Sequence, residues 1–225
     1  MLELAAGTGM GQLMIRAIFW DNDGVLVDTE GLFFAANREI LAEQGIEIDR
    51  DDFADVSLRQ GRSILELIEG IDRTEFEALR LRRNQLYEVA LRGGVRVFEG
   101  VEACLDRLHG QLPMAVVTSS SPEHFKIIHE QTDLMQYFEF VLMGGDYDRH
   151  KPHPDPYLAA AERIGVAPAD CLVVEDSERG LQSATRAGMR CIMIPNSLAG
   201  DADLSLAHAV VDSVSEIPQI VTGLM

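Results

Sequence analysis

Short apolar runs, many of them rich in β-branched residues, recur along the second half of this 225-residue chain. Runs of this length are typical of strands buried on both faces, and stretches with apolar residues at helical spacing lie between them. The pattern predicts six strands, over residues 15–20, 112–117, 139–143, 171–174, 191–194 and 209–211. It predicts helices over residues 121–132, 154–165 and 177–188. This alternation implies right-handed βαβ units, and therefore an α/β fold with a doubly wound parallel sheet.

Strand-like runs disappear between residues 29 and 92, where the pattern is helical. Apolar residues recur three or four positions apart from Leu32 to Leu41, and Gly45 is placed to end that helix. The first strand belongs with the later ones in a single sheet, so the helical segment is an insertion. We expect a core domain of residues 1–30 and 98–225 and an inserted all-helical cap domain of residues 31–97.

Capping residues predict where the later helices of this cap begin. Ser63 with Glu66, and Thr74 with Glu77, fit the S/T-x-x-E capping box. Gly93, which is followed by a second glycine, is placed to end the last cap helix. Residues 1–13 precede the first strand and are expected to form a flexible leader.

Composition and charge narrow the class of protein. Hydrophobic residues make up 47% of the chain and charged residues 25%, as in ordinary globular proteins. A formal charge of −18 argues against nucleic acid or an anionic membrane as partner, and no apolar run reaches the ~20 residues of a spanning helix. Cys104, Cys171 and Cys191 are odd in number and set among apolar residues, which favours a reducing, cytoplasmic location. Without an apolar heptad pattern, we expect a monomer or a weak homodimer.

Polar residues whose side chains can act in catalysis or in ligand binding follow four of the predicted strands. Ligands bind beyond the carboxyl ends of the strands in an open parallel sheet, so these residues are expected to share one site. They are listed in chain order as Asp21 and Asp23, then Thr118 and Ser119, then Lys151, then Glu175 and Asp176.

Each of these residue types has a use if the substrate is a phosphate ester. Asp21 can attack phosphorus, and Asp23, two residues on, can protonate the leaving group and later accept a proton from water. Thr118 and Lys151 can bind the phosphoryl oxygens. Several carboxylates beside a phosphate require a cation, and Mg²⁺ suits oxygen ligands of this kind. Lys151 is one of only two lysines in the chain, which argues against a random surface charge.

Residues 19–30, 116–119, 151–157 and 173–180 together resemble the four motifs of the haloacid dehalogenase superfamily, in particular its β-phosphoglucomutase-like capped phosphatases. The resemblance implies that Asp21 is the nucleophile and Asp23 the general acid and base, and that Thr118 and Lys151 bind phosphate. It implies a magnesium site made by Asp21, Asp23 through its backbone carbonyl, and Asp176, with Glu175 as a direct or indirect ligand.

This sequence differs from several members of the superfamily at residues that their activities require, and these differences indicate which activity to expect. Haloacid dehalogenases proper lack the second aspartate, which is present here as Asp23. Phosphonatases use a cap lysine, and residues 31–97 contain none. β-Phosphoglucomutases carry a histidine four residues after the first motif's threonine, where this chain has Phe33.

We therefore expect a Mg²⁺-dependent phosphatase that acts on a small phosphorylated metabolite, with sugar phosphates among the expected substrates. The alternatives are a phosphosugar mutase and, ranked lower, a non-catalytic phospho-ligand sensor. By resemblance, Arg59 and Arg62 lie in a cap turn that contacts the leaving group. Arg80, Arg82 and Arg83 are expected on a solvated helix face.

Overall fold

The core of the protein is a sheet of six parallel strands in the order β5-β4-β1-β6-β7-β8. The computed structural model describes residues 14–195 and 202–225, so the predicted leader lies outside the described residues. The six predicted strands are confirmed: β1 (Ala17–Trp20), β4 (Met114–Val117), β5 (Phe140–Leu142), β6 (Cys171–Glu175), β7 (Arg190–Met193) and β8 (Ala209–Val210).

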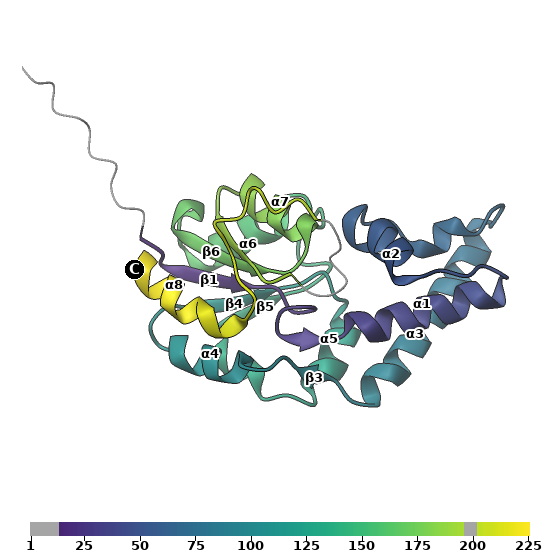
Figure 1. Ribbon diagram of the computed structural model, residues 1–225, viewed down its shortest axis with the longest axis horizontal. Coiled ribbons are helices and arrows are strands. Elements are labelled where there is room, and N and C mark those ends of the chain that lie inside the picture. The colour runs from purple at the N-terminus through teal and green to yellow at the C-terminus, as the bar shows by residue number, and fades with distance from the viewer. Residues whose placement is uncertain (1–13, 196–201) are drawn as a thin grey trace, which may run out of the picture.

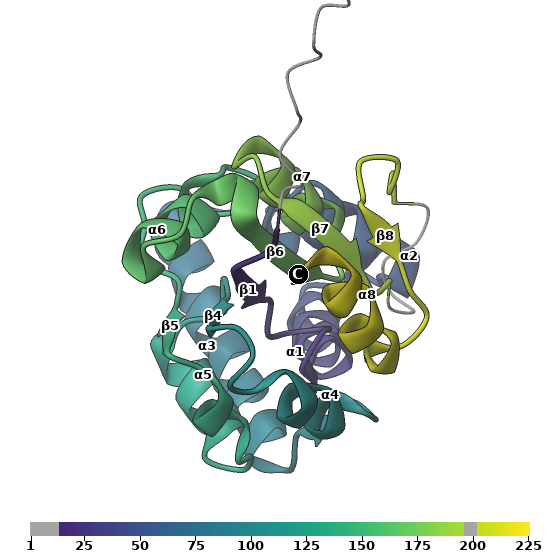
Figure 2. The ribbon, with the colours of Figure 1, turned by 90° about the vertical axis from the view of Figure 1, so that its left-hand side faces the viewer.

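Helices cover both faces of this sheet, as the alternating pattern predicts (Figure 2). One face carries α4 (Val101–Leu108), α5 (Pro122–His129) and α8 (Ile217–Leu224), and the other carries α6 (Asp155–Ile164) and α7 (Glu178–Arg186). Single 3₁₀ turns are η3 (Leu134–Tyr137), η4 (Pro168–Asp170) and η5 (Val214–Glu216). Among the helices in the described ranges, none combines the length and apolar character needed to cross a membrane.

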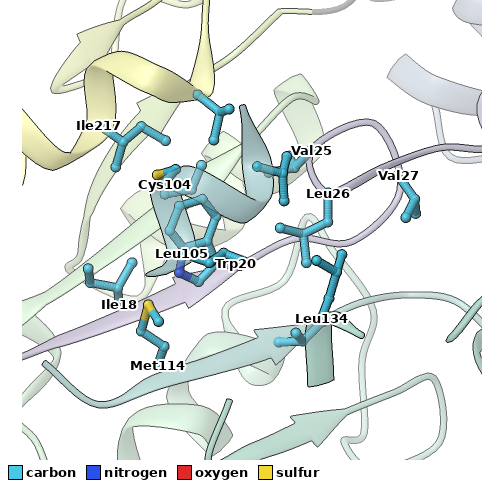
Figure 3. Packing of buried hydrophobic residues seen from close by; sticks show 14 of the residues in the cluster. Ile18, Trp20, Val25, Leu26, Val27, Cys104, Leu105, Met114, Leu134 and Ile217 are labelled. Carbon is cyan, nitrogen blue, oxygen red and sulfur yellow. The ribbon is translucent and has the colours of Figure 1, made fainter. Parts of the chain in front are cut away.

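The alternation of side chains along β1 assigns its residues to the two helical layers. Ala17 and Phe19 point to the layer of α6 and α7, whereas Ile18 and Trp20 point to the layer of α4, α5 and α8. Figure 3 shows Trp20 packed beside Leu105 of α4. β1 is therefore buried on both faces, and its carboxyl end is held rigidly in the middle of the sheet.

The inserted segment forms a group of helices at one end of the core (Figure 1). Its apolar cluster includes Phe34, Leu41, Phe53 and Leu65, so the helices bury their own hydrophobic surface. This packing supports the proposed division into two domains. The elements are α1 (Glu30–Glu43), α2 (Arg50–Phe53), the π-helical η1 (Ala54–Arg59), the 3₁₀ helix η2 (Ile64–Leu67) and α3 (Arg73–Arg92).

The two predicted capping boxes are wrong. Ser63 precedes η2, but its side chain accepts no capping hydrogen bond. The N-cap of α3 is Asp72, whose carboxylate accepts hydrogen bonds from the backbone amides of Thr74 and Glu75. An aspartate two residues upstream therefore fixes the start of α3, while Gly93 follows its last residue as predicted.

A two-stranded ribbon, which the sequence pattern did not predict, joins the start and end of the insertion. β2 (Val27–Asp28) pairs antiparallel with β3 (Arg96–Val97), and the Arg96 guanidinium contacts the Asp28 carboxylate at 2.5 Å. With two residues each, these strands are too short to produce a recognisable periodicity.

The cap cluster predicts a difference between two chemically identical substitutions. Leu41 is fully buried in this cluster, whereas Leu81 on α3 is 56% exposed. Leu41→Ala is expected to lower the free energy of unfolding by about 2–5 kcal/mol, and Leu81→Ala by about 0.5 kcal/mol or less. Urea denaturation measures both values, and equal losses would contradict the cap packing described here.

Candidate active site

A buried lysine connects the ends of three strands. The ammonium Nζ of Lys151 donates hydrogen bonds to Asp21 Oδ1 at 2.5 Å, to Glu175 Oε1 at 2.7 Å and to the carbonyl of Val117 at 2.9 Å. Asp21 follows β1, Val117 ends β4 and Glu175 ends β6. Only 5% of Lys151 is exposed, so protein oxygens take the place of water around its charge.

The single ammonium of Lys151 lies among several carboxyl groups and does not stabilise their charges equally. Their pKa values therefore shift in different directions. Burial acts to raise the pKa of Glu175, but the charge and hydrogen bond of Lys151 outweigh it and hold this pKa below the usual range. Burial raises the pKa of Asp21 to about 8; Lys151 opposes the rise, and Glu175 and Asp23 add to it. Burial also raises the pKa of Asp176 well above its usual value, with further contributions from neighbouring carboxylates.

Glu175 is held by five donors. Besides Lys151, it accepts hydrogen bonds from the hydroxyl of Tyr157 at 2.8 Å and the hydroxyl of Ser177 at 3.0 Å. The backbone amides of Asp176 and Ser177 donate to its second oxygen at 3.2 Å. The Ser177 hydroxyl also accepts from the amide of Gly180 and so caps α7. The carboxylate therefore fixes the loop that carries Asp176.

Three buried carboxylates form a group that could hold a metal ion. Asp21, Glu175 and Asp176 each offer an oxygen, and these oxygens lie within 4.8 Å of one another. Carboxylate oxygens are the ligands that Mg²⁺ prefers, and a divalent cation would offset both the burial and the carboxylate repulsion that raise the pKa of Asp176. The donor set therefore fits Mg²⁺.

Hydroxyl groups surround the second aspartate. Asp23 Oδ1 accepts from the hydroxyl of Thr29 at 2.5 Å, and Oδ2 accepts from the hydroxyls of Ser120 at 2.6 Å and Thr118 at 3.3 Å. Thr29 immediately precedes α1, so Asp23 connects the first cap helix to the loop after β4.

A cavity of about 410 Å³ lies between these core residues and the cap. Thr118 and Ser119 lie in its wall beside Asp21 and Asp23. The core contributes Asp21, Asp23, Thr118, Ser119, Ser120, Ser121, His124, Lys151, Asp176, Ser177 and Arg179. The cap and its junction contribute Thr29, Glu30, Phe33, Phe53, Ser57, Leu58, Arg80, Arg83, Asn84 and Tyr87.

The structure does not bring Arg59 and Arg62 into this cavity. Neither is among the described residues that line it. Arg59 contacts the carboxylate of Asp55 at 3.5 Å, and Arg62 contacts Glu66 at 2.8 Å with half of its side chain exposed. Each guanidinium contacts a carboxylate of its own cap segment, and the buried Nε of Arg59 has no hydrogen-bond partner among the described residues.

Two arginines of α3 face the cavity instead, which corrects the expectation of a fully solvated helix face. Arg83 lies 4.7 Å from the centre of the Phe33 ring and donates to the side-chain oxygens of Asn84 and Asn37. Arg80 also lines the cavity, while the exposed Arg82 pairs with Glu43 on the outside. Helical spacing alone did not show which side of α3 meets the core.

Sequence reasoning also missed residues that support the site. Ser120 binds Asp23, Tyr157 binds Glu175 and Arg179 lines the cavity. Ser120 and Arg179 lie within or beside the polar segments that follow β4 and β6, so proximity to a strand end was an available signal. Tyr157 lies inside α6, and nothing in the local pattern indicates that its hydroxyl reaches Glu175.

Comparisons with known proteins agree with this architecture. Residues 18–194 match the haloacid dehalogenase-like hydrolase family. The chain is 34% identical over 178 residues to a phosphoglycolate phosphatase of Xanthomonas campestris pv. campestris, covering 77% of this chain and 80% of that protein. It is 29% identical to the fructose-1-phosphate phosphatase YqaB of Escherichia coli strain K12, covering 78% and 94% of the two chains.

A solved structure shows the same fold. The crystal structure of a haloacid dehalogenase-like protein from Agrobacterium tumefaciens strain C58 superposes with a TM-score of 0.79. It shares 27% sequence identity, and the match covers 93% of this chain and 98% of that one. With an α/β core, an inserted helical cap and a family match across most of its length, the chain belongs to the haloacid dehalogenase-like hydrolases and is an enzyme.

Proposed function

We propose that this hydrolase is a Mg²⁺-dependent phosphatase that acts on a small phosphorylated metabolite through an aspartyl-phosphate on Asp21. The observation that carries the proposal is the buried group of Asp21, Lys151 and Asp176 at the wall of the cavity. The names of two relatives, a phosphoglycolate phosphatase and a fructose-1-phosphate phosphatase, support a substrate of this size and class.

The carboxylates of Asp21 and Asp176 and the backbone carbonyl of Asp23 would hold the ion. Glu175, which already accepts five hydrogen bonds, supports Lys151 and the loop at Asp176. When bound, Mg²⁺ neutralises charge on the phosphoryl group and on the nucleophile. Thr118 binds a phosphoryl oxygen. Lys151 keeps Asp21 oriented, and because its three protons are all donated to protein oxygens, it binds phosphate when a phosphoryl oxygen replaces one of these acceptors.

The reaction has two displacements. An oxygen of Asp21 forms a bond to phosphorus while the ester P–O bond breaks, and Asp23 gives its proton to the departing alkoxide. Water then attacks the aspartyl-phosphate, its proton passes to Asp23, and inorganic phosphate leaves as the Asp21 carboxylate is restored.

Asp23 must change partners during this sequence. Its two oxygens accept short hydrogen bonds from Thr29 and Ser120. Proton transfer to the leaving group therefore requires one hydroxyl to be replaced by the substrate oxygen. Because Thr29 directly precedes α1, a movement of the cap is suited to making this exchange.

The cap residue at position 33 favours hydrolysis over a mutase reaction. Phe33, where β-phosphoglucomutases carry a histidine, lines the cavity with an apolar ring under Arg83. No proton relay through that position is available, so sugar-phosphate mutation is the less favoured alternative. A phospho-ligand sensor is less favoured still, because the residues that the two displacements require are present.

The setting that we propose is the cytoplasm, with the enzyme as a monomer or weak homodimer and with neither nucleic acid nor membrane as a partner. Cys104, Cys171 and Cys191 are buried free thiols, as expected in a reducing compartment. The formal charge of −18 disfavours polyanionic partners.

Replacement of the nucleophile tests the covalent route. Asp21→Asn is expected to reduce kcat for phosphate release by more than about 10³-fold, because the amide cannot form the acyl-phosphate. A colorimetric phosphate assay over a panel of phosphorylated metabolites measures this loss. Asp170→Asn, at the opposite end of β6, is the matched control. Turnover that survives in Asp21→Asn would refute the covalent mechanism.

Metal removal tests the magnesium site. Treatment with EDTA is expected to lower activity by at least about 10²-fold, and excess Mg²⁺ is expected to restore it. Calorimetric titration of the protein with MgCl₂ should show binding that Asp176→Asn weakens. Full activity after exhaustive chelation would contradict the assignment.

Gly180 provides a test of the support around Glu175. A Cβ at Gly180 would overlap the Glu175 carboxylate, whereas a Cβ at Gly31 in α1 has no neighbouring atom within 4 Å. Gly180→Ala is expected to lower the free energy of unfolding by about 1–3 kcal/mol and to reduce kcat. Gly31→Ala is expected to leave stability unchanged or to raise it, since alanine favours a helix. Thermal unfolding would contradict this account if the two variants behaved alike.

A further inference from the structure

Arg179 is a cation of the cavity wall that the proposed two-step reaction does not use. It lies in the first turn of α7, three residues after Asp176, and its side chain lines the same cavity as Asp21 and Asp23. Its Nη2 donates a hydrogen bond to the backbone carbonyl of Lys151. The guanidinium is therefore tied to the segment that supplies the phosphate-binding lysine.

The charge of Arg179 is not neutralised by an ion pair with any residue that the structure describes. Within the part of the chain that the structure describes, no carboxylate lies within ion-pair distance of it, and its buried Nε has no hydrogen-bond partner. Burial lowers the pKa of Arg179, and the charge of Glu175, which Lys151 already engages, only partly opposes this. A half-buried guanidinium that has no carboxylate partner and lines a cavity is a site for an anion.

The cap packs against Arg179 at the wall of the cavity. The guanidinium packs against Gly61 of the cap, where a Cβ would come within 2.6 Å of Nε. Arg59 and Arg62 flank this glycine but pair with Asp55 and Glu66 instead of facing the cavity. The core thus supplies, at this turn of the cap, the cation that the cap's own arginines do not supply.

We propose that Arg179 determines substrate choice by binding a second anionic group, a carboxylate or a second phosphate, on the leaving-group side of the phosphomonoester. The proposal rests on the phosphatase function above and narrows its substrate class to small phosphate esters with two acidic groups. Nε is buried against Gly61, and Nη2 gives one proton to the Lys151 carbonyl, so the remaining protons of the two Nη atoms are the donors left for an oxygen of either group.

Arg80 and Arg83, the other arginines of the cavity, are weaker candidates for this role. Arg80 already pairs with the Glu77 carboxylate at 2.7 Å. Nε and Nη1 of Arg83 donate to the side-chain oxygens of Asn84 and Asn37, which hold this arginine against the cap over the ring of Phe33. Arg179 is hydrogen-bonded to the backbone of the phosphate-binding lysine, which is why the selectivity is assigned to it.

Matched pairs of substrates test the proposal. 3-Phosphoglycerate and glycerol 3-phosphate differ by a carboxylate in place of a hydroxymethyl group, as do phosphoglycolate and 2-hydroxyethyl phosphate. Fructose 1,6-bisphosphate and fructose 1-phosphate are the pair that tests whether the second anionic group can be a phosphate. For the pair whose length fits, kcat/KM is expected to be about 10- to 100-fold higher for the diacid, mainly through KM.

Substitutions of two arginines on the same helix distinguish a loss of substrate selectivity from a general disturbance of the structure. Arg179→Gln is expected to bring the kcat/KM ratio of the fitting pair close to one, and Arg179→Lys is expected to retain part of it. Arg186→Gln is the matched control, because exposed Arg186 also lies on α7 and donates to a backbone carbonyl, that of Pro152, but does not line the cavity. The control is expected to keep the wild-type ratio, and thermal unfolding of each variant shows that it is folded.

The outcomes are distinct. A diacid preference in the wild type that Arg179→Gln removes and Arg186→Gln keeps supports the proposal. A wild-type enzyme that hydrolyses both members of every pair equally, or a preference that Arg179→Gln leaves intact, overturns it while the phosphatase function stands. Absence of phosphate release from all six esters would instead count against the phosphatase function itself.

Discussion

The buried ammonium of Lys151 is the interaction on which the rest of the site depends. It joins Asp21 after β1, the carbonyl that ends β4 and Glu175 at the end of β6, so it connects three neighbouring strands of the sheet at one edge. Burying this charge is unfavourable unless its acceptors remain in place. The buried carboxylates depend on the ammonium for the same reason. The sheet therefore holds one ammonium and several carboxyls together in a largely buried position at the wall of the cavity.

The support of this cluster extends outward through Glu175 and into the helices. Tyr157 of α6 and the capping serine of α7 donate to the same carboxylate, and Gly180 leaves room for it by having no side chain. The helical layer that covers one face of the sheet thus also determines where Asp176 lies. Packing and chemistry share residues here, which explains why a glycine without any reactive group is needed at the site.

The sequence predicted the sheet and the core site better than the cap. Strands buried on both faces are continuous apolar runs, and each polar residue that follows such a run is carried to the same edge, which is how Asp21, Thr118, Lys151 and Asp176 could be identified. Contacts across the cavity depend on distances that no local pattern encodes. For this reason Arg59 and Arg62 were selected from the cap, whereas Arg83 and Arg179 line the cavity. The ribbon of β2 and β3 was missed because two residues have no measurable period.

That ribbon has a consequence for the architecture as a whole. Because β2 and β3 pair with each other, the chain leaves the core and returns to it at one place, and the sheet of six strands continues without a break in its order. The helices between them therefore enter and leave the core together, and none of their residues takes part in the pairing of the sheet. Contacts such as Arg179 against Gly61, and the hydrogen bond from Thr29 to Asp23, are what join the two parts, so a change on either side of these contacts must be accommodated by the other.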